Sequence, residues 1–168
     1  MFSFQNAISF ITILFSGLIA GLLFSYSCSV NSGLKVLPDG VYLKAMQSIN
    51  AAIQNPYFFL CFMGLLFLFP VYAWLVYAQQ DKTSFYFVLA AAAIYFSGVF
   101  AVTVFGNVPL NELLAKFEIA SASAADISSM RSDFEAHWNT FHLVRTIAAV
   151  ISFSLTILTV LKLNTKVV

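Results

Sequence analysis

The sequence contains few charged residues. Only 9% of its 168 residues are Asp, Glu, Lys or Arg, whereas 61% are hydrophobic. A soluble domain usually carries roughly 25% charged and 45–50% apolar residues. The formal net charge is +1 and the chain has no basic block, so nothing indicates nucleic-acid binding. This composition excludes an ordinary soluble domain and predicts an integral membrane protein.

The chain also lacks the short motifs of several enzyme classes. It has no Walker loop and no G-x-G-x-x-G, H-E-x-x-H or G-x-S-x-G sequence. Its two cysteines, Cys28 and Cys61, do not form a C-x-x-C motif, which argues against a quinone-linked thiol oxidoreductase. We interpret them as small buried side chains, although both lie near one membrane face and a disulfide between them is geometrically conceivable.

The metal-binding residues are equally sparse. Two histidines on different helix faces are too few for a bis-imidazole haem, and no spacing typical of a zinc site is present. We therefore predict no cofactor. A copper or iron site that uses His142 with ligands from other helices stays open, because ligands can be remote in sequence.

The sequence contains long apolar runs. Four of them, at 8–28, 56–79, 85–106 and 141–163, are close to the ~20 residues that a helix needs to cross a bilayer. The first 34 residues contain no Lys or Arg, so the first run lacks the charged start of a signal peptide and we expect it to be retained. The predicted fold class is all-α, a membrane four-helix bundle forming one domain over 1–168.

Four spans place both termini on one side of an inner or plasma membrane. Lys82 and Lys162 lie close to span ends on that side, which favours cytoplasmic termini. Small residues at regular spacing predict close helix packing in lipid, and Gly17 and Gly21 also offer a contact for a homo-oligomer. The two stripes are Gly17, Gly21, Ser25 and Ser29 in the first span, and Ala93, Ser97 and Ala101 in the third.

The connection between the first two spans is predicted to contain an amphipathic lid helix at about 39–54. Asp39 is a suitable cap, and Pro56 ends the segment and begins the second span. Gln47, Asn50 and Gln54 form an uncharged polar stripe. The helix either lies in the membrane interface or folds over the mouth of the bundle. Its apolar stripe consists of Tyr42, Ala45, Met46, Ile49, Ala52 and Ile53.

The third span ends in FGNVPLNELL, residues 105–114, where two asparagines bracket a proline. Pro109 cannot donate a backbone hydrogen bond and pushes Val108 away from helical geometry, so we predict that the helix kinks or stops at Asn107. Asn107 either caps the freed backbone groups or joins a polar site with Asn111. A helical extension at about 127–140, capped at position 123 or 126, is predicted to run unbroken into the fourth span.

The segment DFEAHWNTFHLVRT carries a polar stripe. Glu135, Trp138, His142 and Arg145 share one helix face, and Arg145 lies about one turn inside the apolar run. An arginine at this depth costs several kcal/mol unless it snorkels, pairs or faces a polar cavity. The stripe is therefore either a polar pocket or an interface anchor. The two asparagines and the lid helix lie on the same membrane face as this stripe.

Three segments together resemble the anthrone oxygenase-like family of small membrane proteins. These are YSCSVNSGLKVLPDGVYLKAMQSINAAIQNP, NVPLNELLA and FEAHWNTFHLVRT, and the resemblance extends over essentially the whole chain. SVNSGL replaces a proline-glycine turn that is common in the family. The resemblance implies a four-span fold and points to the polar positions Asn107, Asn111, Trp138, His142 and Arg145, with Met46, Gln47 and Asn50 on the lid helix.

The resemblance implies oxidation of a flat, lipophilic substrate of the anthrone or quinol type with O2. In that reaction His142 would act as the base, while Arg145, Asn107 and Asn111 would stabilise the developing anion. Trp138 and the lid residues would hold the substrate. Two alternatives stay open, namely a non-enzymatic carrier or complex subunit, and a metal- or quinone-linked redox protein.

Overall fold

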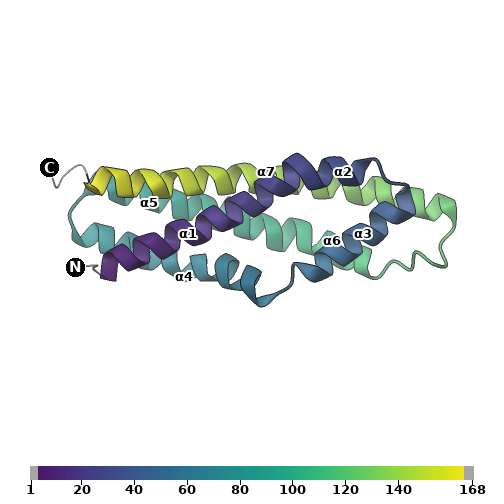
Figure 1. Ribbon diagram of the computed structural model, residues 1–168, viewed down its shortest axis with the longest axis horizontal. Helices are drawn as coiled ribbons and strands as arrows, with labels where there is room; N and C mark the ends of the chain where they lie inside the picture. The colour runs from purple at the N-terminus through teal and green to yellow at the C-terminus, as the bar shows by residue number, and fades with distance from the viewer. Residues whose placement is uncertain (1–3, 165–168) are drawn as a thin grey trace.

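The computed structural model describes residues 4–164 and contains only helices and connections among them. Figure 1 shows the helices lying side by side along one long axis, with both ends of the chain at the same end of the bundle. The elements are α1 (Phe4–Ser25), the π-helical segment η1 (Tyr26–Val30), α2 (Asn31–Lys35), α3 (Asp39–Ala52), α4 (Pro56–Ala78), α5 (Lys82–Ile94), the π-helical segments η2 (Tyr95–Ala101) and η3 (Thr103–Asn107), α6 (Val108–Ala115) and α7 (Ala124–Asn164).

Several of these elements follow one another without a break. The helix that begins at α1 runs on to Lys35, past the predicted end at residue 28, and the helix that begins at α5 runs on to Ala115. The extension and the fourth span are one helix, α7, of 41 residues. At 1.5 Å per residue it is about 60 Å long, roughly twice the hydrocarbon thickness of a bilayer. Part of the bundle therefore stands outside the lipid.

Of the two outcomes predicted at Asn107, a kink or a stop, the stop is wrong, because the helix continues to Ala115. Val108 keeps helical angles (φ −61°, ψ −48°), and its N–H bonds to the carbonyl of Thr103, five residues back. The wide turns of η3 shift the hydrogen-bond register just before Pro109. Pro109 then falls in the first turn of α6. A proline is tolerated there, because the first N–H groups of an α-helix have no carbonyl partner within it.

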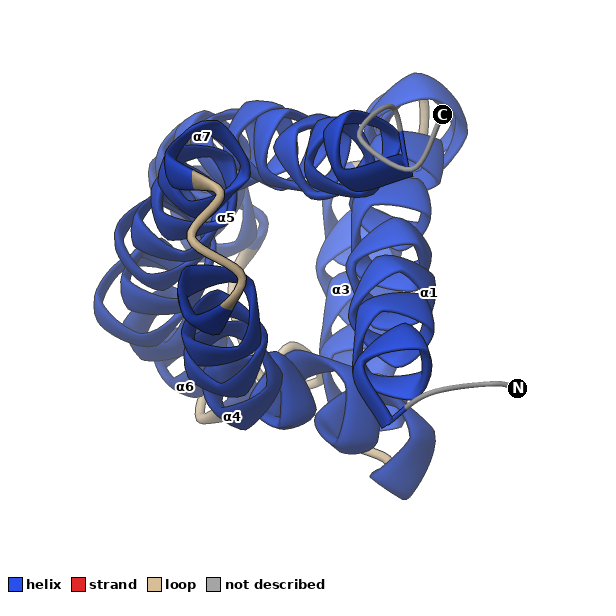
Figure 2. Ribbon diagram, turned by 90° about the vertical axis from the view of Figure 1, so that its left-hand side faces the viewer, coloured by secondary structure: helices blue, strands red, loops and turns tan. Residues whose placement is uncertain are grey.

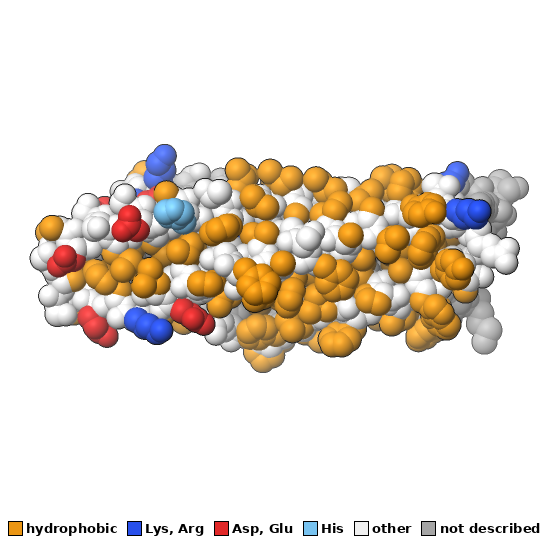
Figure 3. All heavy atoms as spheres, turned by 180° about the vertical axis from the view of Figure 1, so that it is seen from behind, with side chains coloured by type: hydrophobic (Ala, Val, Ile, Leu, Met, Phe, Trp, Pro, Cys, Tyr) orange, Lys and Arg blue, Asp and Glu red, His pale blue; other side chains and the backbone are white. Residues whose placement is uncertain are grey.

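Four helices of the structure are long and apolar enough to cross a membrane: 4–35, 56–78, 82–115 and 124–163. On the face seen in Figure 3, hydrophobic side chains cover the middle of the molecule and charged side chains gather towards its two ends. An apolar girdle between polar ends matches the profile of a bilayer, so the chain is built as a membrane protein.

The membrane core, the hydrophobic cluster along the spans, is built mainly from large side chains of α4 and small ones of α5 and α7. Leu65, Phe69 and Tyr72 are completely buried in it. A Cβ built on Gly98 would lie 2.6 Å from the Cβ of Ala148, so η2 and α7 are in backbone-close contact. A Cβ on Gly17 would meet the ring of Phe153 at 3.0 Å. Small residues thus bring helices together, as is usual in lipid.

The predicted small-residue stripes do not coincide with the buried faces. Gly21, Ser25, Ala93 and Ser97 are exposed, and a Cβ on Gly21 would have nothing within 4 Å. The buried face of α1 instead carries hydroxyl side chains that bond to their own helix or pack against neighbours. Its residues are Ser9, Thr12, Ser16, Ile19, Ala20 and Leu23.

The lid helix, α3, packs onto α6 and α7. In the end-on view of Figure 2 it overlaps α1, and Figure 1 shows that it lies further along the bundle. Its side chains Tyr42, Leu43 and Met46 are buried together with residues of α2, α6 and α7. We call this second hydrophobic group the lid cluster, and its buried members are Leu34, Tyr42, Leu43, Met46, Leu114, Phe134 and Trp138.

The start of α3 is held by an arginine on α7. Arg131 Nη1 donates to the carbonyl oxygen of Leu37 at 2.6 Å and to Asp39 Oδ1 at 3.0 Å, and its Nη2 donates to the carbonyl oxygen of Lys35 at 2.9 Å. Its Nε also bonds to Glu135 Oε2 at 2.8 Å. Asp39 therefore pairs with Arg131 and does not cap α3, whose cap position is occupied by Pro38. The predicted side-chain cap is wrong because the charge of Arg131 attracts the carboxylate.

Two other predicted helix starts agree with the structure. Asn55 accepts from the N–H of Phe58 and α4 begins at Pro56, as expected from the proline. At the start of α7, Ser123 Oγ accepts from the N–H of Asp126 at 3.2 Å, while Asp126 Oδ2 accepts from the N–H of Ser123 at 3.3 Å. This reciprocal pair is a capping box, and it starts the helix at Ala124.

Candidate active site

The predicted polar stripe on α7 lies at the junction of the two hydrophobic clusters. Trp138 belongs to the lid cluster and Ala149 to the membrane core, and His142 and Arg145 occupy the helix between them. Two π-helical segments contribute to the same place, η1 from the first span and η3 from the third. Wide π turns redirect side chains, and they are frequent at functional sites.

His142 is only 1% exposed and is hydrogen-bonded through both ring nitrogens. Its Nδ1 lies 3.1 Å from Nη2 and 3.3 Å from Nε of Arg145. Its Nε2 lies 2.9 Å from Ser27 Oγ on η1. Thr146, one turn further along α7, donates to the carbonyl oxygen of His142 at 2.7 Å. The imidazole is thus held in one orientation by side chains of η1 and α7.

Arg145 is partly exposed and has only neutral partners among the residues that the structure describes. Its Nη1 donates to Thr103 Oγ1 at 3.5 Å, in addition to the contacts with His142. Its guanidinium also lies 5.2 Å from the centre of the Trp138 ring, within reach of a cation–π interaction. No carboxylate of the described chain pairs with it, so its positive charge is available to a ligand.

An aromatic stack connects this site to the lid. The rings of Trp138 and His142 lie 5.0 Å apart and nearly parallel, at 12°. The Trp138 indole N–H donates to Asn111 Oδ1 at 2.8 Å. Tyr26 packs against both rings, with its centre 5.4 Å from Trp138 and 5.1 Å from His142. The Tyr26 hydroxyl donates to Met46 Sδ at 3.2 Å, which brings the lid helix into the same cluster.

Asn107 does not cap its own helix. It is completely buried, and its Nδ2 donates to the backbone carbonyl of Trp138 at 3.2 Å. Because a carbonyl can only accept, this contact determines which way the amide points. The Oδ1 atom is then buried without a partner among the residues that the structure describes. A buried acceptor of this kind is uncommon and is suited to a hydroxyl of a ligand.

The three lid residues of the predicted site occupy different environments. Met46 is buried beside Tyr26. Asn50 is 8% exposed, and its Nδ2 is buried with no partner within residues 4–164. Gln47 points elsewhere, because its Nε2 donates to the carbonyl oxygens of Leu114 at 2.9 Å and Phe117 at 3.0 Å.

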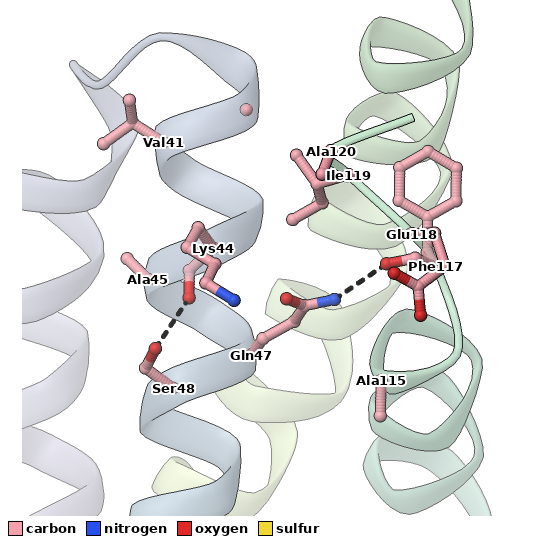
Figure 4. Close-up of a pocket in the computed structure, with 11 residues that line it drawn as sticks. Val41, Lys44, Ala45, Gln47, Ser48, Ala115, Phe117, Glu118, Ile119 and Ala120 are labelled. Carbon is pink, nitrogen blue, oxygen red and sulfur yellow. Dashed lines mark hydrogen bonds between the residues drawn. The ribbon is translucent and has the colours of Figure 1, made fainter. Parts of the chain in front are cut away.

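Gln47 lines a groove of about 700 Å³ between α3 and the segment that follows α6. Figure 4 shows its amide reaching across to the backbone of Phe117, with Lys44 and Glu118 on opposite sides. The structure therefore brings His142, Arg145, Trp138, Asn111 and Met46 together, whereas Gln47 faces a separate groove.

Four residues of this site were not predicted from the sequence: Tyr26, Ser27, Thr103 and Thr146. Thr146 follows His142 by four residues and so shares its helix face, which is a signal that helical periodicity provides. Ser27 and His142 are separated by 115 positions, and nothing local indicates their contact. The second histidine, His137, lies outside this site on an exposed face of α7, where its Nδ1 bonds to the backbone carbonyl of Asp133 at 2.7 Å.

Outside the spans, Tyr42 of the lid helix has an altered environment. Its ring lies 4.4 Å from the guanidinium carbon of Arg131. Burial, reinforced by the nearby Glu135 carboxylate, raises the pKa of the Tyr42 phenol well above its usual range, although Arg131 acts in the opposite direction. The phenol is therefore a neutral packing group of the lid cluster.

The residues described by the structure do not place three or more His, Cys, Asp or Glu side chains close enough together to hold a metal ion. Cys28 is exposed and Cys61 is partly exposed, and neither is part of a disulfide. The donors gathered at the site are instead an imidazole, a guanidinium, an indole, amides and hydroxyls. This set suits the binding of carbonyl, hydroxyl and anionic oxygen atoms.

Comparison with known proteins identifies the family. A family model described as anthrone oxygenase matches residues 58–155, which is more than half of the chain. No curated protein and no solved structure matches the chain. The matched segment includes Asn107, Asn111, Trp138, His142 and Arg145. It begins after η1 and the lid helix, which therefore lie outside the match. The membership expected from the sequence motifs is thereby confirmed, and the chain belongs to the anthrone oxygenase family.

Proposed function

We propose that this protein is a membrane-embedded oxidoreductase that oxidises a flat, lipophilic ketone of the anthrone type with O2. The observation that carries the proposal is Arg145, a guanidinium inside a membrane helix with only neutral partners among the described residues. An arginine costs roughly 2.5–3.5 kcal/mol at the centre of a span and less nearer its end, where Arg145 lies. A purely structural position would favour an apolar residue or an added carboxylate. A site for an anionic oxygen explains the arrangement.

The chemistry of an anthrone matches that charge. The carbon opposite the carbonyl group carries acidic hydrogens, because loss of one proton spreads the electron pair onto the carbonyl oxygen. Arg145 stabilises that oxygen as it becomes negative, and the effect is strong in a water-poor site. His142 is the base that takes the proton. The Trp138 ring, stacked on His142, offers a flat apolar surface for the polycyclic substrate.

The overall reaction converts a CH2 group and one O2 molecule into a C=O group and one water molecule. The enolate formed at the site transfers an electron to O2, and the resulting radical and superoxide combine at carbon to give a peroxide. Cleavage of the O–O bond, with loss of the second hydrogen as a proton, leaves one oxygen in the new carbonyl group. The other oxygen leaves as water with both protons. Asn107 Oδ1 is the acceptor for a hydroxyl group on the substrate.

The test is oxygen uptake by purified protein in detergent, with anthrone as substrate. The His142→Ala variant should be slower by about 10²–10⁴-fold, which is what a positioned general base contributes. His137→Ala is the matched control, because His137 is exposed on the same helix and its ring bonds to the backbone carbonyl of Asp133. It should keep the wild-type rate.

Three other results would contradict the proposal and favour a different role for the protein. Equal rates for wild type and His142→Ala would rule out His142 as the base. If the wild type consumes no oxygen, the protein is better explained as a carrier for lipophilic molecules or as a subunit of a larger complex. Metal content is measured on the same sample, and stoichiometric metal that is lost in His142→Ala would make His142 a metal ligand instead of a base.

A further inference from the structure

The hydrogen bonds of His142 show which of its ring nitrogens carries a hydrogen. A guanidinium can donate but cannot accept, so the Nδ1 atom that faces Arg145 at 3.1 and 3.3 Å must carry a lone pair. The ring is therefore neutral with its hydrogen on Nε2, since a doubly protonated ring would set N–H against N–H. Nε2–H then donates to Ser27 Oγ at 2.9 Å.

The remaining hydroxyls complete the chain of donors. Thr146 Oγ1 uses its hydrogen on the carbonyl oxygen of His142, at 2.7 Å. Its lone pairs are thus left to accept from the Ser27 hydroxyl, 3.3 Å away. Arg145 can only donate, so its contact with Nδ1 puts the His142 hydrogen on Nε2. Ser27 Oγ accepts that hydrogen and so supports the tautomer, with Thr146 accepting from Ser27 in turn.

This arrangement covers the only nitrogen of His142 that is able to take a proton. The lone pair of Nδ1 points at the guanidinium of Arg145, so a base in this state is blocked. Arg145 is the more accessible of the two, because it is partly exposed whereas His142 is 1% exposed. A ligand arriving from the membrane meets the guanidinium first. A carbonyl oxygen competes with the imidazole for the guanidinium, and as it gains enolate charge it accepts more strongly than a neutral imidazole does.

We infer that Nδ1 of His142 is the proton-accepting atom, that Arg145 masks it in the ligand-free protein, and that a ligand oxygen which takes the guanidinium unmasks it. Ser27 is a positioning residue, because it holds the ring in the tautomer that leaves Nδ1 unprotonated. This inference rests on the proposed function. In the step itself, a C–H bond of the substrate breaks, an N–H bond forms at Nδ1, and the electron pair stays on the substrate as an enolate facing Arg145.

The consequence is that the base is active only when its substrate is bound. The ligand-free protein does not expose a free imidazole lone pair, and binding of the ketone oxygen both releases the base and places the stabilising charge. Arg145 thus serves twice, as the mask of Nδ1 and as the partner of the anion. The reaction is thereby coupled to ligands that carry a carbonyl group.

The tautomer is measured by nitrogen NMR on protein labelled with ¹⁵N-histidine. The chain has two histidines, and the structure assigns them opposite tautomers. His137 Nδ1 faces a backbone carbonyl, so its hydrogen is on Nδ1, and this residue serves as an internal reference. His142 should show the hydrogen on Nε2, and spectra of His142→Ala identify its signals. A His142 hydrogen on Nδ1 in the wild type would overturn the inference.

Masking by Arg145 is tested with and without a ligand. In Arg145→Met the Nδ1 signal of His142 should move downfield, because the nitrogen loses its hydrogen-bond donor. Saturating anthraquinone, a flat ketone that cannot be oxidised further, should move the wild-type signal in the same direction. An unchanged signal in Arg145→Met would refute the mask, and an unchanged signal with anthraquinone would refute its release.

Ser27→Ala separates positioning from simple structural support. It should lose the single tautomer of His142 and lower kcat for anthrone more than it changes KM, while Ser29→Ala, on the exposed side of η1, should leave the spectrum unchanged. Retention of a pure Nε2–H tautomer in Ser27→Ala would remove Ser27 from the inference. The proposed function fails independently, through absent oxygen uptake, whatever the spectra show.

Discussion

The contact between Gly98 and Ala148 makes a stability prediction whose size follows from the structure. A methyl group added at Gly98 would lie 2.6 Å from the Cβ of Ala148, whereas ordinary contacts of a Cβ fall at 3.4–4 Å. An alanine methyl cannot rotate out of the way, so the two helices must separate. Overpacking of a tight contact typically costs about 1–3 kcal/mol. Gly98→Ala should therefore lower the free energy of unfolding.

A matched control removes the effect of helix propensity. Replacing glycine by alanine in a helix by itself stabilises by up to about 1 kcal/mol. Gly21 is also helical, but a Cβ there has nothing within 4 Å. Gly21→Ala should thus be neutral or stabilising, and the two variants should differ by about 1–3 kcal/mol in the free energy of unfolding. The difference corresponds to a shift of a few degrees in the midpoint of thermal unfolding, followed by circular dichroism in detergent.

The reverse substitution on the partner helix shows whether the clash is the cause. In the double variant Gly98→Ala/Ala148→Gly the two residues are exchanged, and one methyl group again occupies the contact. A double-mutant cycle should then give a favourable coupling of about 1–3 kcal/mol. Additive losses, or a Gly98→Ala protein as stable as Gly21→Ala, would contradict the close approach of η2 and α7.

Two further predictions concern the lid end of the bundle. Asn111→Leu removes the acceptor of the Trp138 indole N–H and should cost about 1–3 kcal/mol, because a buried donor is left unpaired. Adding Trp138→Phe removes that donor and should recover part of the loss, whereas equal or larger destabilisation would contradict the unpaired-donor explanation. The raised pKa of Tyr42 keeps its phenol neutral in the folded state. The free energy of unfolding should therefore stay constant below pH 10.0, the ordinary pKa of tyrosine, and fall as the pH rises above that value. Tyr42→Phe should flatten that fall in chemical unfolding curves recorded against pH, and an unchanged slope would show that Tyr42 is not responsible.

The site has an arrangement that stability alone does not favour. Asn107 Oδ1 is buried without a partner among the described residues, and Arg145 has only neutral partners there. Unpaired buried polar groups are destabilising and are few in folded proteins. Asn107 contacts Trp138 and Arg145 contacts His142, so a ligand that pairs with both would bind beside these two rings. Replacing such groups is therefore expected to affect binding more than folding.

Local properties of the sequence determined several features correctly. A span is recognised from about twenty consecutive apolar residues, which depends on composition and not on tertiary contacts. The stripe of Trp138, His142 and Arg145 follows from helical periodicity, because residues three and four apart share a face of any helix. Pro56, which begins α4, and the capping residue Ser123 act on backbone groups within the first turn of their helices. All of these are relations between neighbours in the chain.

Tertiary structure alone decided which faces are buried and which remote residues complete the site. In lipid an apolar residue is equally stable on either face of a span, so hydropathy does not say that α1 buries Ser9, Thr12 and Ser16 and exposes Gly21. The continuation of the third span through Pro109 depends on a shifted hydrogen-bond register in η3, which residue preferences do not reveal. The contact of Ser27 with His142 across 115 positions exists only because α7 packs antiparallel to the first span, and that packing supplies the acceptor for the Nε2 hydrogen of His142.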